Sequence, residues 1–240
     1  MTPNIGGKWG EQEKEKEESP PRLGDLGGKM KDLKYEDLEL FKFLQQKPCK
    51  LLDQMLTKGI NSPLASSCGR LFDAVAAAIG ICRESCSYEG QGAIILEALA
   101  EQAISSNPEE IKPYPFSIEN RKLEGQSYLP YIEPRLMWQA LLEDLRCNTS
   151  QSVMAAKFHL GLANAIASSV EHICHNNQDV IIKQVALTGG VFQNQILLNQ
   201  VRIRLEAIKL EVLTHSQVPP NDGGISLGQA AIAVAQFANN

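Results

Sequence analysis

Two adjacent glycines and an asparagine separate a predicted strand from a predicted helix, in the stretch LTGGVFQN at residues 187–194. Glycines at a strand end let the backbone approach a ligand, because no Cβ stands in the way. Backbone N–H groups at the start of the next helix can bind a phosphate or ribose oxygen, and Asn194 offers both a donor and an acceptor. Gly189, Gly190 and Asn194 are therefore candidate nucleotide-binding residues. The alternative is a tight turn in which Asn194 only caps the helix.

A carboxylate stands before the last predicted helix, in the stretch VPPNDGGISLGQAAIA. Pro219 and Pro220 stiffen the extended segment before the helix, and two glycines begin the helix. At that position Asp222 can cap the helix. It can equally hold a divalent cation in the crevice beyond the carboxyl ends of parallel strands.

Asp73 is a single acid within an apolar helical stretch, after Arg70 in SSCGRLFDAVAAAIG. An unpaired buried carboxylate is costly. Asp73 must therefore point outward, be paired, or bind a ligand hydroxyl.

The spacing of apolar residues predicts the elements that position these groups. Leu, Phe, Met and Ile recur at three- and four-residue intervals, which is typical of amphipathic helices. Capping residues and glycines mark their ends. We expect six helices in the first three quarters of the chain, over residues 36–46, 49–59, 66–80, 93–104, 135–145 and 152–175. Residues 105–130 are expected to form a loop, apart from a strand candidate at PFSIE.

The pattern changes after residue 178. DVIIKQVALTGG predicts a strand, the run after Asn194 a helix, EVLTH a second strand, and ISLGQAAIAVAQFA a closing helix with small residues for close packing. Strand, helix, strand is one parallel βαβ unit. Two strands and one candidate do not make a parallel sheet that stands alone, because such sheets need several strands and cover on both faces. We therefore expect the chain to be part of a larger sheet.

Composition places the chain among ordinary globular proteins, with 43% hydrophobic and 21% charged residues. A net charge of −5 without basic clusters argues against a nucleic-acid partner. No apolar run approaches the roughly 20 residues that span a bilayer. Six scattered cysteines without a C-x-x-C pair indicate reduced thiols and a cytoplasmic location. Residues 1–33 are charged and lack large apolar residues, so we expect a disordered tail before one domain over residues 34–240.

Five stretches together resemble a known family. SPLASSCGRLFDAVAAAIG, SYEGQGAIILEALA, KFHLGLANAIA, VALTGGVFQNQILL and THSQVPPNDGGISLGQA are similar, in this order, to the C-terminal portion of HypF-type carbamoyltransferases, which mature nickel–iron hydrogenases. The resemblance covers about residues 40–238. A more distant similarity runs to the TsaD-type tRNA threonylcarbamoyl-transfer enzymes.

The resemblance implies a fold and a set of site residues. The fold would be helix-rich α/β, a partial actin-like ATPase (ribonuclease H-like) lobe with a parallel βαβ unit near the C-terminus. Asp73 would contact the nucleotide ribose, and Asp222 would bind a divalent metal. The nucleotide would be lined by Gly90, Gly189, Gly190 and Asn194.

The resemblance also implies a reaction. Family members turn carbamoyl phosphate and ATP into carbamoyl adenylate and pass the carbamoyl group to the C-terminal cysteine of a HypE-type acceptor. The implied partners are that acceptor and a complementary N-terminal HypF-type chain. The implied ligands are ATP or carbamoyl adenylate and a divalent metal.

The sequence also departs from the family pattern. Relatives carry an H-x-x-x-H metal pair upstream, and none of the four histidines here forms it. His172 and His175 instead indicate a C-terminal helix cap, and no role follows from the sequence for His159. In YEGQG, Gly90 matches the glycine pair of the tRNA enzymes but Gln91 does not. Three hypotheses remain: an incomplete enzyme part, a non-catalytic remnant or interaction module, and a free-standing ATPase.

Overall fold

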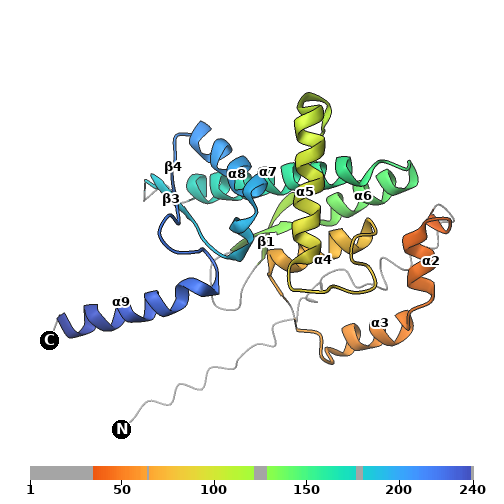
Figure 1. Ribbon diagram of the computed structural model, residues 1–240, viewed down its shortest axis with the longest axis horizontal. Helices are drawn as coiled ribbons and strands as arrows, with labels where there is room; N and C mark the ends of the chain where they lie inside the picture. The colour runs from red at the N-terminus through yellow and green to blue at the C-terminus, as the bar shows by residue number, and fades with distance from the viewer. Residues whose placement is uncertain (1–34, 64, 122–128, 177–180, 239–240) are drawn as a thin grey trace, which may run out of the picture.

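The computed structural model describes residues 35–63, 65–121, 129–176 and 181–238 (Figure 1). The predicted disordered tail at residues 1–33 lies outside these ranges. The α-helices of the described residues are α2 (Glu39–Gln45), α3 (Cys49–Lys58), α4 (Cys68–Ala78), α5 (Gln91–Ser106), α6 (Arg135–Arg146), α7 (Gln151–Asn176), α8 (Gln195–Ala207) and α9 (Ile225–Ala238). The strands are β1 (Ser117–Arg121), β2 (Leu129–Glu133), β3 (Gln184–Leu187) and β4 (Glu211–Thr214), and the short 3-10 helices are η2 (Pro108–Glu110), η3 (Gly190–Gln193) and η4 (Asp222–Gly224).

The predicted helices all form, because their apolar spacing matches the helical repeat. Their ends follow the expected capping residues. Helix α3 ends at Gly59, whose φ of 65° is the left-handed conformation that glycine adopts most readily. The Ser150 hydroxyl accepts from the Val153 N–H at 3.4 Å at the start of α7.

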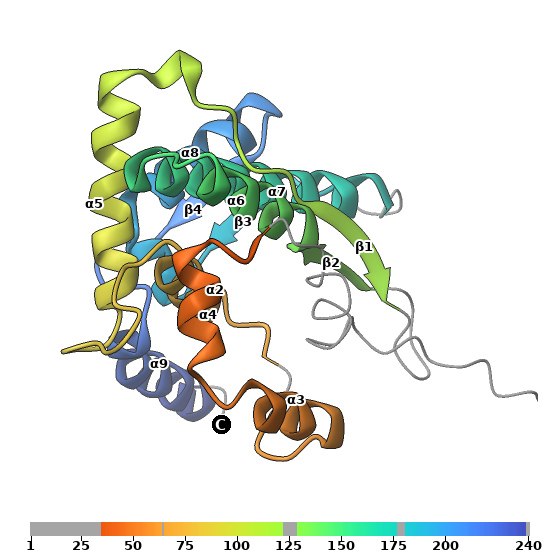
Figure 2. The same cartoon turned by 90° about the vertical axis from the view of Figure 1, so that its right-hand side faces the viewer.

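Helix α7 is the centre of the hydrophobic core, with α5 and α8 packed against it (Figures 1 and 2). Its buried positions combine large side chains with glycine and alanine, which let neighbouring backbones approach closely. At Gly161 an added Cβ would lie 2.3 Å from the Tyr114 carbonyl oxygen, so the segment after η2 crosses α7 at this glycine. By length and composition α7 could span a membrane, but half of its apolar window is buried inside the protein.

The strands form two separate two-stranded sheets in the described residues. Strands β3 and β4 are parallel, with Val185 opposite Val212, and α8 connects them. The predicted βαβ unit is therefore confirmed. Strand β1 confirms the PFSIE candidate, and it pairs antiparallel with β2, with Ile118 opposite Ile132. The prediction of a loop up to residue 130 was wrong at β2, where Pro130 and Pro134 obscured the strand pattern.

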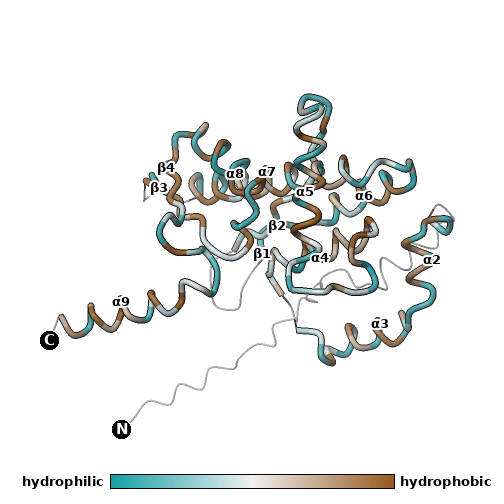
Figure 3. Tube along the Cα trace, viewed as in Figure 1, coloured by the Kyte–Doolittle hydropathy of each residue, from teal (hydrophilic) through white to brown (hydrophobic). Residues whose placement is uncertain are grey.

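Helix α9 forms where predicted but does not pack as expected. All fourteen of its residues are exposed, and the helix extends away from the body (Figures 1 and 3). The prediction of close packing was wrong for the described part of the chain. Small apolar residues allow a helix to pack closely against a neighbouring element, but they do not provide that neighbour.

Candidate functional site

Asn194 is a nearly buried side chain at the start of α8, with 9% of its surface exposed. Its Oδ1 accepts a hydrogen bond from the Leu197 N–H at 2.8 Å, so Asn194 caps helix α8. Its Nδ2 lies 2.9 Å from Nε2 of His159 on α7. Each end of the amide is thus bonded within the protein, which leaves one N–H and one oxygen lone pair for a ligand.

His159 is fully buried, and its environment sets its protonation. Nδ1 lies 2.8 Å from the Ala155 carbonyl oxygen, which can only accept, so Nδ1 carries the proton and Nε2 accepts from Asn194. The rings of Phe72 and Phe158 stand edge-on to the imidazole, with centroids 5.2 and 5.8 Å away. Burial lowers the pKa of His159 from 6.5 to about 4, so the ring is neutral at pH 7. Sequence reasoning missed this role, since the partner is 35 residues away.

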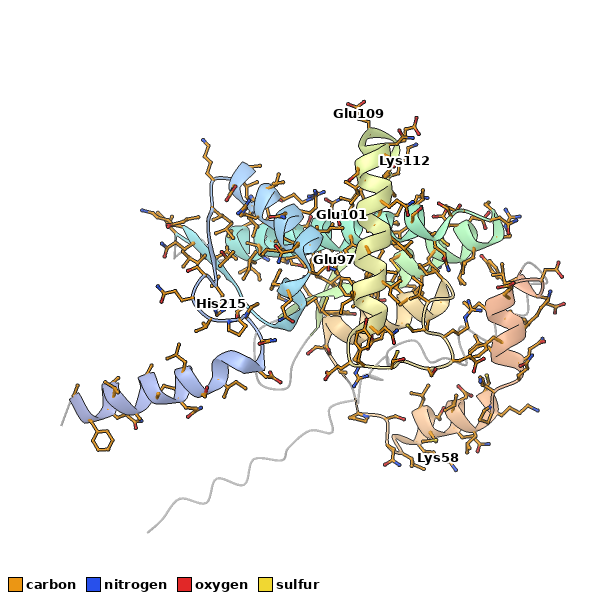
Figure 4. The ribbon with its side chains drawn as sticks, in the orientation of Figure 1. Lys58, Glu97, Glu101, Glu109, Lys112 and His215 are labelled. Carbon is orange, nitrogen blue, oxygen red and sulfur yellow. The ribbon has the colours of Figure 1, made fainter. Side chains whose placement is uncertain are left out.

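A carboxylate from another helix occupies the start of α8. Glu97, labelled on α5 in Figure 4, accepts from the N–H groups of Gln195 at 2.6 Å and Ile196 at 3.4 Å. Negative charge is favourable at a helix N-terminus. Sequence reasoning assigned these N–H groups to a phosphate or ribose oxygen. In the structure Glu97 and Asn194 already bind the first three, because α5 packs beside α8.

The glycine turn and the loop before Asp222 lie side by side. The Gly189 N–H donates to the Pro220 carbonyl oxygen at 2.8 Å. A Cβ added to Gly190 would lie 3.7 Å from the Asn221 Cβ. Gly189 has a φ of 105°, and a Cβ there would meet no atom within 4 Å. The glycine is needed for backbone conformation rather than for packing, and its outer side is open.

Asp73 and Gly90, two further candidate nucleotide-binding residues, lie on α4 and at the start of α5. Asp73 points outward, as expected, with its side chain 47% exposed and 3.9 Å from the Arg70 guanidinium. Gly90 begins α5 with a φ of 76°, and a Cβ there would also meet open space. At Gly92 a Cβ would lie 3.1 Å from the Ala76 Cβ and 3.9 Å from Asp73 Oδ1. Helix α4 also contacts η3, the short helix that contains Gly190.

The described residues do not make a complete metal site. Asp222 is exposed at the start of η4, and no group of three or more His, Cys, Asp or Glu side chains that could hold a metal occurs among them. His175 Nδ1 donates to the Glu171 carbonyl oxygen over 2.8 Å, which matches its expected place at the end of a helix. His215, at the end of β4, lies 2.8 Å from the Thr188 hydroxyl beside the glycine turn (Figure 4).

Comparison with known proteins shows which family the chain resembles. A family model described as "Carbamoyltransferase, Kae1-like Domain, second subdomain" matches residues 25–229. Carbamoyltransferase HypF of Rhodobacter capsulatus is 37% identical over 193 residues, which are 80% of this chain and 23% of that protein. Carbamoyltransferase HypF2 of Cupriavidus necator is 35% identical over 210 residues, which are 82% of this chain and 25% of that protein.

Solved structures show the same relationship. A crystal structure of full-length HypF in the phosphate- and nucleotide-bound form is 36% identical, with a TM-score of 0.66 over 81% of this chain and 24% of that one. The HypF structure from T. kodakarensis is 25% identical, with a TM-score of 0.65 over 91% of this chain and 26% of that one.

The helix-rich α/β fold and its matched residues define a Kae1-like carbamoyltransferase subdomain. The chain belongs to the HypF family of carbamoyltransferases, and it spans about a quarter of the length of the relatives it matches.

Proposed function

We propose that this chain supplies the nucleotide-holding part of a HypF-type carbamoyltransferase. The enzyme would form carbamoyl adenylate from carbamoyl phosphate and ATP, and carbamoylate the C-terminal cysteine of a HypE-type acceptor during nickel–iron hydrogenase maturation. The observation that carries the proposal is the open glycine turn, held by Pro220 and followed by Asn194. Support also comes from a relative of the same fold whose structure is a nucleotide-bound form.

The two left-handed glycines would give the nucleotide access to the backbone. Gly90 and Gly189 have positive φ values and open space where a side chain would lie. The exposed carboxylate of Asp73 could accept hydrogen bonds from ribose hydroxyls, since carboxylates accept such bonds strongly. Because Glu97 occupies the start of α8, we assign phosphate contacts to the glycine turn rather than to that helix.

The transfer step needs a nucleophile from outside this part of the protein. The acceptor thiolate would attack the carbamoyl carbon, so that a C–S bond forms while the C–O bond to the adenylate phosphate breaks. AMP leaves with the bonding electron pair, and the thiol proton goes to solvent. The contribution of this chain would be to hold the nucleotide and orient the carbamoyl group, which accelerates attack by fixing its geometry.

Asp222 is the single ligand that we propose from this chain for a divalent cation, and we assign that cation no step. We also propose that the fold is one lobe of an actin-like ATPase, that a complementary N-terminal HypF-type chain completes the site, and that the protein is cytoplasmic. The alternative function, a non-catalytic interaction module of the same family, is favoured by the exposure of α9.

Calorimetric titration with a non-hydrolysable ATP analogue and Mg²⁺ tests the proposal. We expect saturable binding that Asn194→Ala and Gly189→Val weaken, because the first loosens the turn and the second forces a branched side chain into a positive φ. Glu109→Ala, in η2 beyond the far end of α5, is the matched control and should leave binding unchanged. A chain that is folded by circular dichroism but binds no nucleotide would support the interaction module instead.

A further inference from the structure

His159 on α7 is a buried titratable side chain that the proposed reaction does not use. The side chain is fully buried, so it does not touch a bound nucleotide itself. Both ring nitrogens are bonded within the protein, Nδ1 to the Ala155 carbonyl oxygen over 2.8 Å and Nε2 to Asn194 Nδ2 over 2.9 Å. A fully paired buried group of this kind can act on a binding site through the residue that it orients.

The His159 imidazole decides which way the Asn194 amide points. The Ala155 carbonyl oxygen can only accept, so the proton is on Nδ1 and Nε2 can only accept. Nε2 therefore selects the amide nitrogen of Asn194, and Oδ1 accepts from the Leu197 N–H at 2.8 Å. With the amide turned over, its nitrogen would face a second N–H donor and its oxygen would face the Nε2 lone pair. Both hydrogen bonds would be lost, so the neutral imidazole fixes a single orientation.

Asn194 also belongs to the glycine turn through its backbone. Its N–H donates to the Val191 carbonyl oxygen at 3.1 Å, and the Phe192 N–H donates to the Gly189 carbonyl oxygen at 3.1 Å. These bonds lie in and around η3, between the open glycine and helix α8. The Asn194 side chain keeps 9% of its surface exposed, with one N–H and one oxygen lone pair left for a ligand. A contact that orients Asn194 therefore acts on the residues around the turn.

Two phenylalanine rings hold the imidazole in this position. Phe72 and Phe158 stand edge-on to it, with centroids 5.2 and 5.8 Å away, and both rings are buried. Phe72 lies directly before Asp73 in α4. His159 therefore contacts both the neighbour of one candidate nucleotide residue and the amide of another, Asn194.

We propose that His159 is a positioning residue of the nucleotide site, whose Nε2 holds the Asn194 amide in the orientation that binds the nucleotide. This inference deepens the proposed function and rests on it. The role requires no proton transfer, only a neutral acceptor inside the core. The alternative is that His159 merely fills space between α7 and α8. A ring of the same size without a hydrogen-bonding group would then replace it without loss of binding.

Calorimetric titration of the full chain with the ATP analogue and Mg²⁺ tests this difference. His159→Phe keeps the ring but removes the acceptor, and it should weaken binding about tenfold. His159→Gln keeps an acceptor on a side chain of similar reach, and its affinity should stay within about threefold of the wild type. Leu141→Val, the matched control, removes one methylene from a fully buried side chain on α6 and should leave binding unchanged. Circular dichroism checks that all three variants fold.

A double-mutant cycle separates positioning from general destabilisation. If His159 acts through Asn194, His159→Phe should cause no further loss of affinity in a chain that already carries Asn194→Ala. Losses that multiply would show that the two residues act independently, and they would overturn the inference. A His159→Phe variant that binds like the wild type would also overturn it. So would a His159→Gln variant that binds as weakly as His159→Phe.

Isotope-edited NMR of the chain without nucleotide gives a readout that does not depend on binding. At neutral pH His159 should carry its proton on Nδ1, and the Asn194 side-chain amide resonances should move in His159→Phe. A proton on Nε2 would overturn the inference. If the wild-type chain binds no nucleotide, the proposed function fails and this inference fails with it. If Asn194→Ala weakens binding but His159→Phe does not, only this inference fails.

Discussion

His159 Nε2 accepts a hydrogen bond from Asn194 Nδ2 over 2.9 Å, joining the middle of α7 to the start of α8. The Ala155 carbonyl oxygen holds the proton on Nδ1, so Nε2 must accept. Asn194 is then oriented with Oδ1 toward the Leu197 N–H. A buried chain of hydrogen bonds thereby fixes the residue that follows the glycine turn, and its members act as a unit.

Replacing His159 by Phe tests this chain of hydrogen bonds. The ring volume is nearly kept, but Asn194 Nδ2 loses its partner inside the core. We expect the free energy of unfolding to fall by about 1–3 kcal/mol, the cost of an unsatisfied buried donor. Urea denaturation measures it. The control is His215→Phe at an exposed position, where a loss above about 0.5 kcal/mol is not expected. Equal losses in both variants would contradict the assigned role.

The pH dependence of stability should carry a contribution from His159. Its pKa is about 4 in the folded protein and about 6.5 when unfolded, so the unfolded state binds the proton first. The stabilisation is present above pH 6.5 and is lost as the pH falls toward 4. At about 1.4 kcal/mol per pKa unit, the loss amounts to roughly 3 kcal/mol. Unfolding titrations between pH 4 and 7 should show a shallower slope for His159→Phe than for the wild type. Identical slopes would show that the His159 imidazole is protonated as readily in the folded protein as in the unfolded chain.

Gly161 is predicted to be the least replaceable glycine in the core. Gly161→Ala would place a methyl group 2.3 Å from the Tyr114 carbonyl oxygen, so the backbone must move. We expect a loss of about 1–3 kcal/mol, or more if the crossing segment detaches. Gly228→Ala is the matched control, because it lies in helix α9 with no atom within 4 Å. It should raise stability slightly, by up to about 1 kcal/mol, through helix propensity. Thermal melts compare the stability of the two variants. Similar melting temperatures would argue against the close crossing of the Tyr114 segment and α7 at Gly161.

Glu97 should stabilise the start of α8 through its carboxylate. Glu97→Ala removes the acceptor of the Gln195 and Ile196 N–H groups, and a loss of about 1 kcal/mol is expected, as for other helix caps. Glu97→Gln keeps an acceptor but loses the favourable charge, so it should cost less. Glu101→Ala, one turn further along α5, serves as the control. The account fails for Glu97 if the three variants denature at the same urea concentration.

The sequence predicted the local structure better than the contacts between distant residues. The apolar spacing located every α-helix of the described residues, and β3–α8–β4 formed as expected, because these patterns are local. Strand β2 was missed, since Pro130 weakens the strand pattern. The sequence singled out Asn194 as both ligand group and helix cap, but not the histidine that orients it. His159 and Glu97 act through contacts across 35 and 98 residues, which no local pattern reveals.

The exposure of α9 has a different origin. The helix was predicted from a local pattern of small and apolar residues, and it forms. Whether such a face is buried depends on a surface elsewhere, and the described residues leave every position of α9 exposed. The nucleotide and metal roles of Asp73, Gly90, Gly189, Gly190, Asn194 and Asp222 stay predictions.

The measurement that tests the nucleotide site most directly is a titration of the isotope-labelled chain with the ATP analogue, followed by amide NMR shifts. We expect saturable shifts at Gly90, Gly189 and Gly190, and at the residues flanking Asp73, with none at Glu109 in η2, beyond the far end of α5. Saturable shifts confined to other surfaces, or none at all in a folded chain, would contradict it.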